Sequence, residues 1–149
     1  MDGHPRGHAL RKGRYSCPGQ IYLVTTVTVE REPVFGDLWA ARSVVRALMS
    51  EAQQQTAKTL AYVIMPDHLH WLLELGEPDS LSRVMRRVKA VSAHRVGRPI
   101  WQKGFHDRAL RREEDLAGAA RYIVANPLRA GLVRHVGDYP HWDAVWLSP

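Results

Sequence analysis

Two histidines separated by one residue are the first candidates for chemistry in this chain. His68 and His70 stand in Tyr62–Leu75, which reads YVIMPDHLHWLLEL. Pro66-Asp67 separates two short apolar runs, which favours two strands joined by a turn. Because side chains alternate across a strand, both imidazoles are expected on one face and Leu69 on the other. Adjacent imidazoles can bind a metal ion, although two polar residues at the mouth of a strand can also be satisfied by water or backbone.

A tyrosine and an asparagine nearer the C-terminus form the second candidate group. Tyr122 and Asn126 are four residues apart in a segment of helical periodicity, so they are expected on one face, at the flank of the buried stripe. A phenol is a poor nucleophile at neutral pH because its pKa is about 10, but a nearby cation or metal favours the phenolate. Asn126 could add an amide oxygen to a metal held by the histidines, which would suit Mg²⁺ or Mn²⁺. From the pattern alone, a half-buried tyrosine with Asn126 capping the helix remains the alternative.

The composition bounds the class of protein. The 149 residues are 45% hydrophobic and 24% charged, which is typical of a globular protein, and we expect one domain, 1–149, with a mobile basic arm at 1–19. Cys17 is the only cysteine, which leaves no internal disulfide and favours the cytoplasm. No apolar run approaches the length of a membrane span, so no membrane partner is expected. The formal charge of +6, mostly from arginine, makes a polyanion the expected partner.

Strands and helices alternate in the pattern that must position these residues. The expected ranges are a strand at 21–29, a helix capped by Asp37, strands at 60–65 and 69–75, a helix beginning at Ser80, a strand at 105–111 and a helix at 115–125. The first six elements have the βαββαβ order of a ferredoxin-like α+β sandwich, a sheet covered on one face by two helices. The additional helix carries Tyr122, and Pro127 is expected to end it. The aromatic tail from Tyr139 to Trp146 is expected to fold back onto the body.

Arginines mark the outer side of the second predicted helix. They are Arg83, Arg86, Arg87 and Arg95. A solvated charged face is the ordinary explanation, but an almost purely cationic one favours a groove for nucleic acid. The first three are therefore the expected contacts to nucleic-acid phosphates.

Five ordered stretches of the chain resemble one known family, the REP-associated tyrosine transposases. These belong to the single-tyrosine HUH transposases, where U is a large apolar residue, Leu69 here. The resemblance covers nearly all of the chain after the basic arm. The five stretches are PGQIYLVTT, YVIMPDHLHWLLEL, IWQKGFHDRALRREEDL, RYIVANPLRAGLV and GDYPHWDAVWL.

The resemblance implies a role for each candidate residue. It implies a ferredoxin-like fold in which His68 and His70 bind a divalent metal, with Asn126 as third ligand. It implies Tyr122 as the nucleophile. Relatives often have F-H-D-H where this chain ends the motif with Arg108, a change that could alter phosphate contacts, and Arg108 is counted among the DNA-binding residues.

The implied activity is that of a metal-dependent single-stranded DNA endonuclease and strand transferase. Similar proteins act on DNA with palindromic hairpins, which implies a cytoplasmic, nucleoid-associated protein. They act as monomers or homodimers. The cut would leave a 5′-phosphotyrosine link and a free 3′-OH. Two alternatives remain: a non-catalytic hairpin-binding module or repressor derived from a transposase, and a metal-dependent phosphodiesterase in which water attacks.

Overall fold

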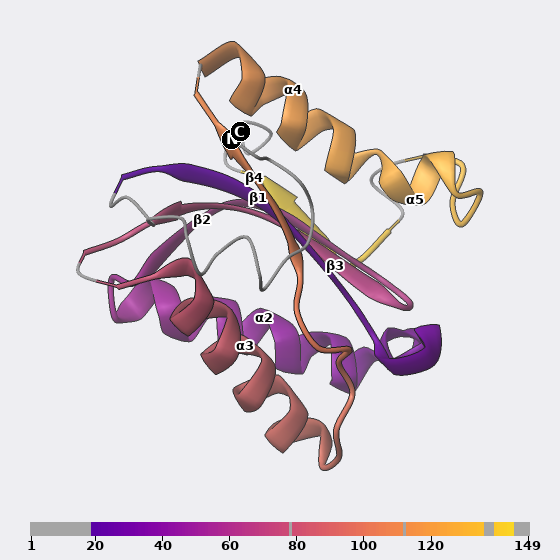
Figure 1. Ribbon diagram of the computed structural model, residues 1–149. Coiled ribbons are helices and arrows are strands. Elements are labelled where there is room, and N and C mark those ends of the chain that lie inside the picture. Colours follow the sequence, from indigo (N-terminus) through magenta and orange to yellow (C-terminus); the bar gives the residue numbers. More distant parts are fainter. Residues whose placement is uncertain (1–18, 78, 112, 136–138, 145–149) are drawn as a thin grey trace.

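A five-stranded antiparallel sheet is the frame of the molecule (Figure 1). The computed structural model describes residues 19–77, 79–111, 113–135 and 139–144, so all but the last position of the predicted basic arm lies outside the described residues. The strands lie in the order β4-β1-β3-β2-β5. They are β1 (Ile21–Val27), β2 (Ala57–Met65), β3 (His68–Leu75), β4 (His106–Leu110) and β5 (Trp142–Ala144).

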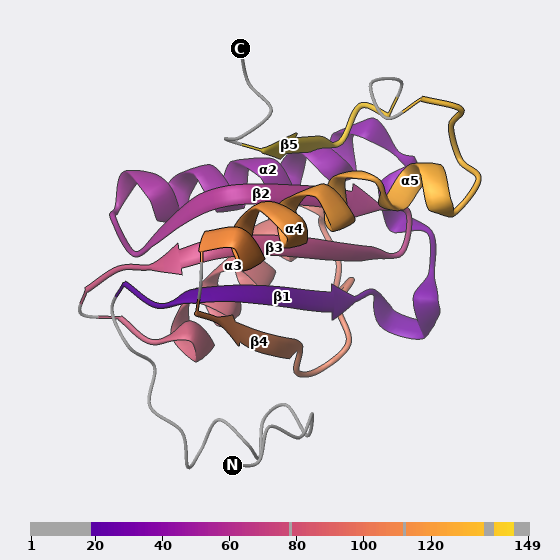
Figure 2. The same cartoon turned by 90° about the horizontal axis from the view of Figure 1, so that it is seen from above.

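Helices cover both faces of this sheet. Figures 1 and 2 show α2 and α3 on one face and α4 and α5 on the other. The first four strands with α2 and α3 follow the predicted βαββαβ order, so the ferredoxin-like α+β prediction is confirmed. The helices are α2 (Leu38–Gln53), α3 (Leu81–Val96), α4 (Glu113–Val124) and α5 (Asn126–Arg129), and the turns η1 (Val29–Arg31) and η2 (Val34–Gly36) join β1 to α2. None of the described helices is both long and apolar enough to cross a membrane.

Local sequence signals explain where α2 and α3 begin and end. The side chain of Asp37 accepts a hydrogen bond of 3.0 Å from the Ala40 backbone N–H, which caps α2. Ser80 caps α3 in the same way, through the backbone N–H of Arg83 at 3.2 Å. α3 ends at Gly97, whose φ of 98° is left-handed and therefore suits a residue without a Cβ atom. Both helices thus start at the predicted residues.

The alternation of side chains along β3 divides the core in two. Leu69 and Trp71 are fully buried against α2 and α3. Leu72 points the other way and packs with Ala120 and Ile123 of α4. Each face of the central strand is therefore anchored by its own apolar cluster, which fixes the register of the residues between them.

The break before Pro127 confirms the predicted end of the tyrosine helix. α4 ends at Val124, and Pro127 then lies in the first turn of a further short helix, α5, which was not predicted. Proline is tolerated there because the first N–H groups of a helix have no partner within it. Asn126 consequently begins a new short helix.

The C-terminal strand β5 was not predicted. It pairs with the edge of β2. Next to it the hydroxyl of Tyr139 donates a hydrogen bond of 2.5 Å to the Ile64 carbonyl. The expectation that the aromatic tail folds back is therefore confirmed for Tyr139 and Trp142, while Trp146 lies outside the described residues.

Candidate active site

His68 and His70 lie side by side at the start of β3, on the face that carries α4. Their ring centroids are 4.7 Å apart and their planes make an angle of 80°. Val63 and Met65, their pairing partners on β2, belong to the cluster packed against α4. The two imidazoles therefore share one face, as the alternation of the strand predicts.

Each imidazole is oriented through its Nδ1 atom. Nδ1 of His68 lies 2.7 Å from Oδ1 of Asp67, and Nδ1 of His70 forms a hydrogen bond of 2.8 Å with the hydroxyl of Thr25 on β1. Neither Nε2 atom has a partner among the residues that the structure describes. Metal-binding histidines are commonly held in this way, with one ring nitrogen fixed by a neighbour and the other left for the ion.

Arg31 supports this arrangement from the turn after β1. Its Nε atom donates a hydrogen bond of 3.0 Å to Oδ2 of Asp67. Glu30 and Arg31 have φ angles of 53° and 54°, a left-handed conformation that costs a non-glycine residue about 1 kcal/mol or more. Burial opposes ionisation of Asp67, but the hydrogen bond from His68 and the charges of His68 and Arg31 together lower its pKa. Asp67 is therefore a carboxylate at neutral pH.

His70 is neutral at physiological pH. Burial, together with smaller effects of the positive charges of His68 and Arg129, lowers its pKa to about 4. A metal ion binds the unprotonated imidazole, so this state needs no loss of a proton before an ion can bind. Sequence patterns alone gave no indication of this property.

Tyr122 projects from α4 into solvent. It is 59% exposed, whereas Ile123 and Ala120 on the same helix are buried. Gly118, one turn earlier, has open space where a Cβ atom would lie. The ring of Tyr122 is covered instead by Arg129, whose Cζ atom is 3.7 Å from the ring centroid. Sequence reasoning missed Arg129; its seven-residue spacing from Tyr122, about two helical turns, is the signal that could have indicated it.

The segment from Tyr122 to Arg129 lies near the histidines. Figure 2 shows α4 running along the sheet and α5 at the end where β2 finishes and β3 begins. This is the end at which His68 and His70 stand. The structure thus brings the tyrosine helix and the histidine pair to the same end of the same face.

The donor set fits a divalent cation with open coordination positions. Within the described part of the chain no three His, Cys, Asp or Glu side chains converge, so the protein would supply two imidazoles and no carboxylate. The half-buried Asn126, at the start of α5, adds an amide oxygen as a candidate. Mg²⁺ and Mn²⁺ accept such oxygen and nitrogen ligands and retain positions for water or phosphate.

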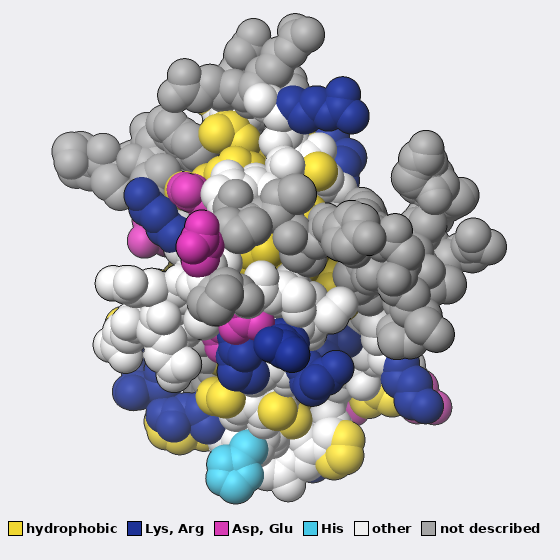
Figure 3. Space-filling model, turned by 60° about the vertical axis from the view of Figure 1, so that its left-hand side comes forward, with side chains coloured by type: hydrophobic (Ala, Val, Ile, Leu, Met, Phe, Trp, Pro, Cys, Tyr) yellow, Lys and Arg dark blue, Asp and Glu magenta, His cyan; other side chains and the backbone are white. Residues whose placement is uncertain are grey.

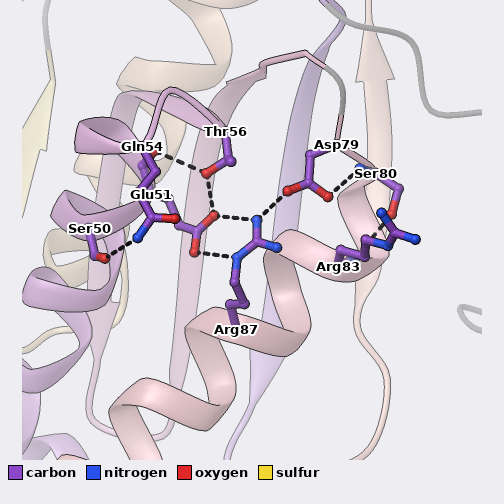
Figure 4. Close-up of polar contacts among 8 residues, drawn as sticks. All are labelled: Ser50, Glu51, Gln54, Thr56, Asp79, Ser80, Arg83 and Arg87. Carbon is purple, nitrogen blue, oxygen red and sulfur yellow. Dashed lines mark hydrogen bonds and ion pairs between the residues drawn. The ribbon is translucent and has the colours of Figure 1, made fainter.

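Arg87, an expected DNA contact, forms ion pairs within the protein. Its guanidinium donates to Glu51 at 3.0 and 2.8 Å and to Asp79 at 2.5 Å (Figure 4). Glu51 is only 3% exposed and also accepts a hydrogen bond from Thr56. Arg87 therefore joins α3 to α2, and its charge is balanced before any nucleic acid binds.

The other expected DNA contacts lie on two different sides of the sheet. Arg83 and Arg86 are exposed on α3, the layer opposite to the histidines. Arg108 is exposed on β4 and pairs with Leu23, which places it on the face that carries α4. Of the four arginines, Arg108 is thus the one that shares a face with His68 and His70.

A further basic surface lies beside α2, away from the histidines. It is a groove of about 740 Å³, and its charged lining residues are all arginines. Val91 occupies an inward position in the helical periodicity of α3, yet it is 39% exposed in this groove. Figure 3 likewise shows basic side chains in several separate groups on one side of the molecule. Charge alone therefore does not locate a nucleic-acid site. The groove is lined by Leu38, Arg42, Val45, Arg46, Met49, Ser50, Gln53, Tyr62, Val91, Arg95, Pro140 and His141.

Two curated proteins are similar to this chain in sequence. The REP-associated tyrosine transposase of Escherichia coli (strain K12) is 37% identical over 83 residues, which are 54% of this chain and 50% of that protein. A putative REP-associated tyrosine transposase of Haemophilus influenzae is 30% identical over 100 residues, 56% of this chain and 57% of that protein. The chain thus spans about half the length of the curated relatives it matches.

Solved structures and a family model extend the match. The structure of a REP-associated tyrosine transposase bound to a REP hairpin superposes with a TM-score of 0.75 and 26% identity, covering 87% of this chain and 79% of that one. A putative transposase from Deinococcus radiodurans shares the fold, with a TM-score of 0.54, 23% identity, and coverage of 74% of this chain and 93% of that one. The family model described as "Transposase IS200 like" matches residues 17–123, which include His68, His70 and Tyr122. Since this span is well over half of the chain, the protein belongs to the IS200-like transposase family.

Proposed function

We propose that this protein is a metal-dependent single-stranded DNA endonuclease and strand transferase that cuts next to palindromic hairpins. One observation carries the proposal: two imidazoles, whose Nε2 atoms have no partner among the described residues, lie at the end of the sheet face over which α4 presents an exposed tyrosine. In this proposal Tyr122 is the nucleophile. The protein acts in the cytoplasm at the nucleoid, as a monomer or homodimer.

The proposed reaction is a transesterification. The phenol oxygen of Tyr122 forms a bond to phosphorus while the bond between phosphorus and the 3′-oxygen breaks. The phenol proton passes to solvent, and the departing 3′-oxygen takes up a proton to become a free 3′-OH. The DNA keeps its 5′-phosphate on Tyr122. Because that link conserves the phosphodiester bond energy, a second 3′-OH can reverse the step and join strands without ATP.

His68 and His70 would hold Mg²⁺ or Mn²⁺ through their Nε2 atoms, with the Asn126 amide oxygen as third ligand. Such an ion, when bound, supplies Lewis-acid polarisation of the phosphate and neutralises charge on it. Asp67 and Thr25 support the proposal because their hydrogen bonds fix both rings through Nδ1. The neutral state of His70 supports it as well.

A DNA hairpin with a single-stranded flank is the proposed substrate. Support comes from the structural relative, whose solved complex contains a REP hairpin. Arg108 is the proposed phosphate contact on the face of the histidines, and Arg83 and Arg86 are proposed contacts on the opposite layer. Arg87 is left out of this set because Glu51 and Asp79 already balance its charge.

The decisive experiment tests for a covalent adduct. A hairpin oligonucleotide labelled 3′ of the cut is incubated with Mn²⁺ or Mg²⁺ and separated on a denaturing gel. We expect the label to migrate with the protein. The matched control, Tyr122→Phe, retains the ring and should bind DNA but form no adduct.

Other outcomes assign a different function. Cleavage without an adduct would mean that water attacks, which is the phosphodiesterase alternative. Tight binding without any cleavage would identify a hairpin-binding module. Cleavage that persists in excess chelator would remove the metal from the proposal.

A further inference from the structure

The guanidinium of Arg129 lies over the ring of Tyr122. The Cζ atom lies 3.7 Å from the centroid of the ring, within the range of a cation–π contact. No hydrogen bond or ion pair of its guanidinium is found among the described residues, and the side chain is exposed. A solvated arginine usually samples many rotamers. Among the described residues no carboxylate fixes the side chain of Arg129, so charge balance does not explain why it lies over the ring.

Stacking leaves the hydrogen-bonding groups of this arginine available. The five N–H donors of a guanidinium lie in its plane and point outward from its edge. When the face rests on an aromatic ring, that edge remains open to an acceptor beside the ring. A phosphate oxygen is the acceptor to which the forked geometry of arginine is best matched.

The short helix α5 puts this cation at the reacting end of the sheet. Backbone hydrogen bonds from Arg129 to Ala125 and from Ala130 to Asn126, of 3.0 and 2.9 Å, carry the helical turn past the break after α4. Tyr122, Asn126 and Arg129 therefore follow one another on one flank. Figure 2 shows α5 at the end of the sheet where β2 finishes and β3 begins, the end at which the histidine pair lies.

We propose that Arg129 is a positioning residue that stacks on Tyr122 and binds a non-bridging oxygen of the phosphate that Tyr122 attacks. The proposal rests on the proposed function, because it assigns a partner to the same nucleophile. Attack by a phenol oxygen concentrates negative charge on the phosphate, and a fixed cation beside it stabilises that charge more in the transition state than before it. The stack also restricts rotation of the phenol.

The phosphate contact can be tested without cleavage. In the Tyr122→Phe background the ring is kept and DNA stays intact, so hairpin binding can be measured against salt concentration. Adding Arg129→Gln should flatten the log–log salt slope by about one unit, the effect of one lost phosphate contact. Arg98→Gln is the control, because Arg98 is already paired with Glu32. An unchanged slope in the Arg129 variant overturns the phosphate contact.

The positioning role is tested by single-turnover adduct formation at saturating hairpin DNA. Arg129→Gln should slow the step about 100-fold, the scale of one lost donor at a developing charge. Arg129→Lys, which keeps the charge but not the planar fork, should recover part of that loss. A rate within about twofold of wild type for Arg129→Gln contradicts the role, because such a change corresponds to less than about 0.5 kcal/mol.

The stack itself has a spectroscopic signature. In nuclear magnetic resonance spectra the side-chain protons of Arg129 should be shifted upfield by the ring, and Tyr122→Leu should remove that shift. No shift in the wild type would mean that the stack is absent in solution and would end the inference. If wild type forms no adduct, the proposed function fails, while the salt slope and the ring shift still decide whether Arg129 binds phosphate beside Tyr122.

Discussion

Replacing Arg87 with glutamine is expected to destabilise the fold by removing the counter-charge of a buried carboxylate. Glu51 is 3% exposed, and within the described part of the chain its carboxylate would keep only the hydrogen bond from Thr56. Removing one partner of a buried ion pair costs about 3–5 kcal/mol. Because the Arg87 side chain is 36% exposed, water can replace part of the lost contact, so we expect about 2–3 kcal/mol. For a chain of this size that lowers the melting temperature by about 5–10 °C.

The assay is urea denaturation followed by tryptophan fluorescence, with the wild type and the variants compared at one pH and salt concentration. The matched control is Arg98→Gln, which breaks an ion pair whose side chains are 45% and 47% exposed. Exposed pairs contribute about 0–1 kcal/mol, so the control should stay close to wild type. Equal losses in both variants would refute the reasoning from burial.

A double substitution separates the lost pair from the stranded charge. Glu51→Gln together with Arg87→Gln removes both members, so no buried carboxylate is left without its partner. The double variant should therefore be more stable than Arg87→Gln alone. An additive loss would show that the penalty does not come from the stranded carboxylate of Glu51.

Two further predictions concern the histidine end of the sheet. His68→Ala should abolish metal-dependent adduct formation, while its free energy of unfolding stays within about 1 kcal/mol of the wild-type value. Asn126→Ala should weaken the metal dependence less, because an amide is a poorer ligand than an imidazole. Equal metal titration curves for wild type and His68→Ala would remove His68 from the metal site. Asp67→Asn should weaken Mn²⁺ binding about 10–100-fold in isothermal titration calorimetry, the usual cost of losing the group that orients a ligating histidine. Unchanged affinity in that variant would mean that the Asp67–His68 contact does not orient the ring for an ion.

The sheet and the histidine pair were predictable because their signals are local. Alternation over Tyr62–Leu75 places His68 and His70 on one face whatever packs against them. Asp37 and Ser80 each satisfy a backbone N–H group three residues away, so the starts of α2 and α3 follow from neighbouring residues alone. Tyr122 was likewise placed correctly at an exposed helix flank.

The role of Arg87 was not predictable because its partner is remote in sequence. A helix-face pattern groups Arg87 with Arg83 and Arg86 as one cationic surface. Only the packing of α3 against α2 reveals that Glu51 lies under one of the three (Figure 4). A buried carboxylate on α2 thus gives Arg87 of α3 a structural role, and the periodicity of α3 alone cannot predict that role.

The two halves of the candidate site rest on different supports, and this should make them separable. His68 and His70 lie in a central strand between two apolar clusters, and their rings are fixed by Thr25 and Asp67. Tyr122 stands exposed on α4, and its described ring contact is with Arg129, which follows the break at Ala125.

Weakening one support should therefore leave the other in place. Asp67→Asn should reduce affinity for Mn²⁺ without moving the upfield-shifted protons of Arg129. Arg129→Gln should slow attack while affinity for Mn²⁺ falls by less than about threefold, since neither ring loses the hydrogen bond that orients it. If each variant instead impaired both properties equally, α5 and the start of β3 would have to move as one unit, and the separate supports would not govern the site.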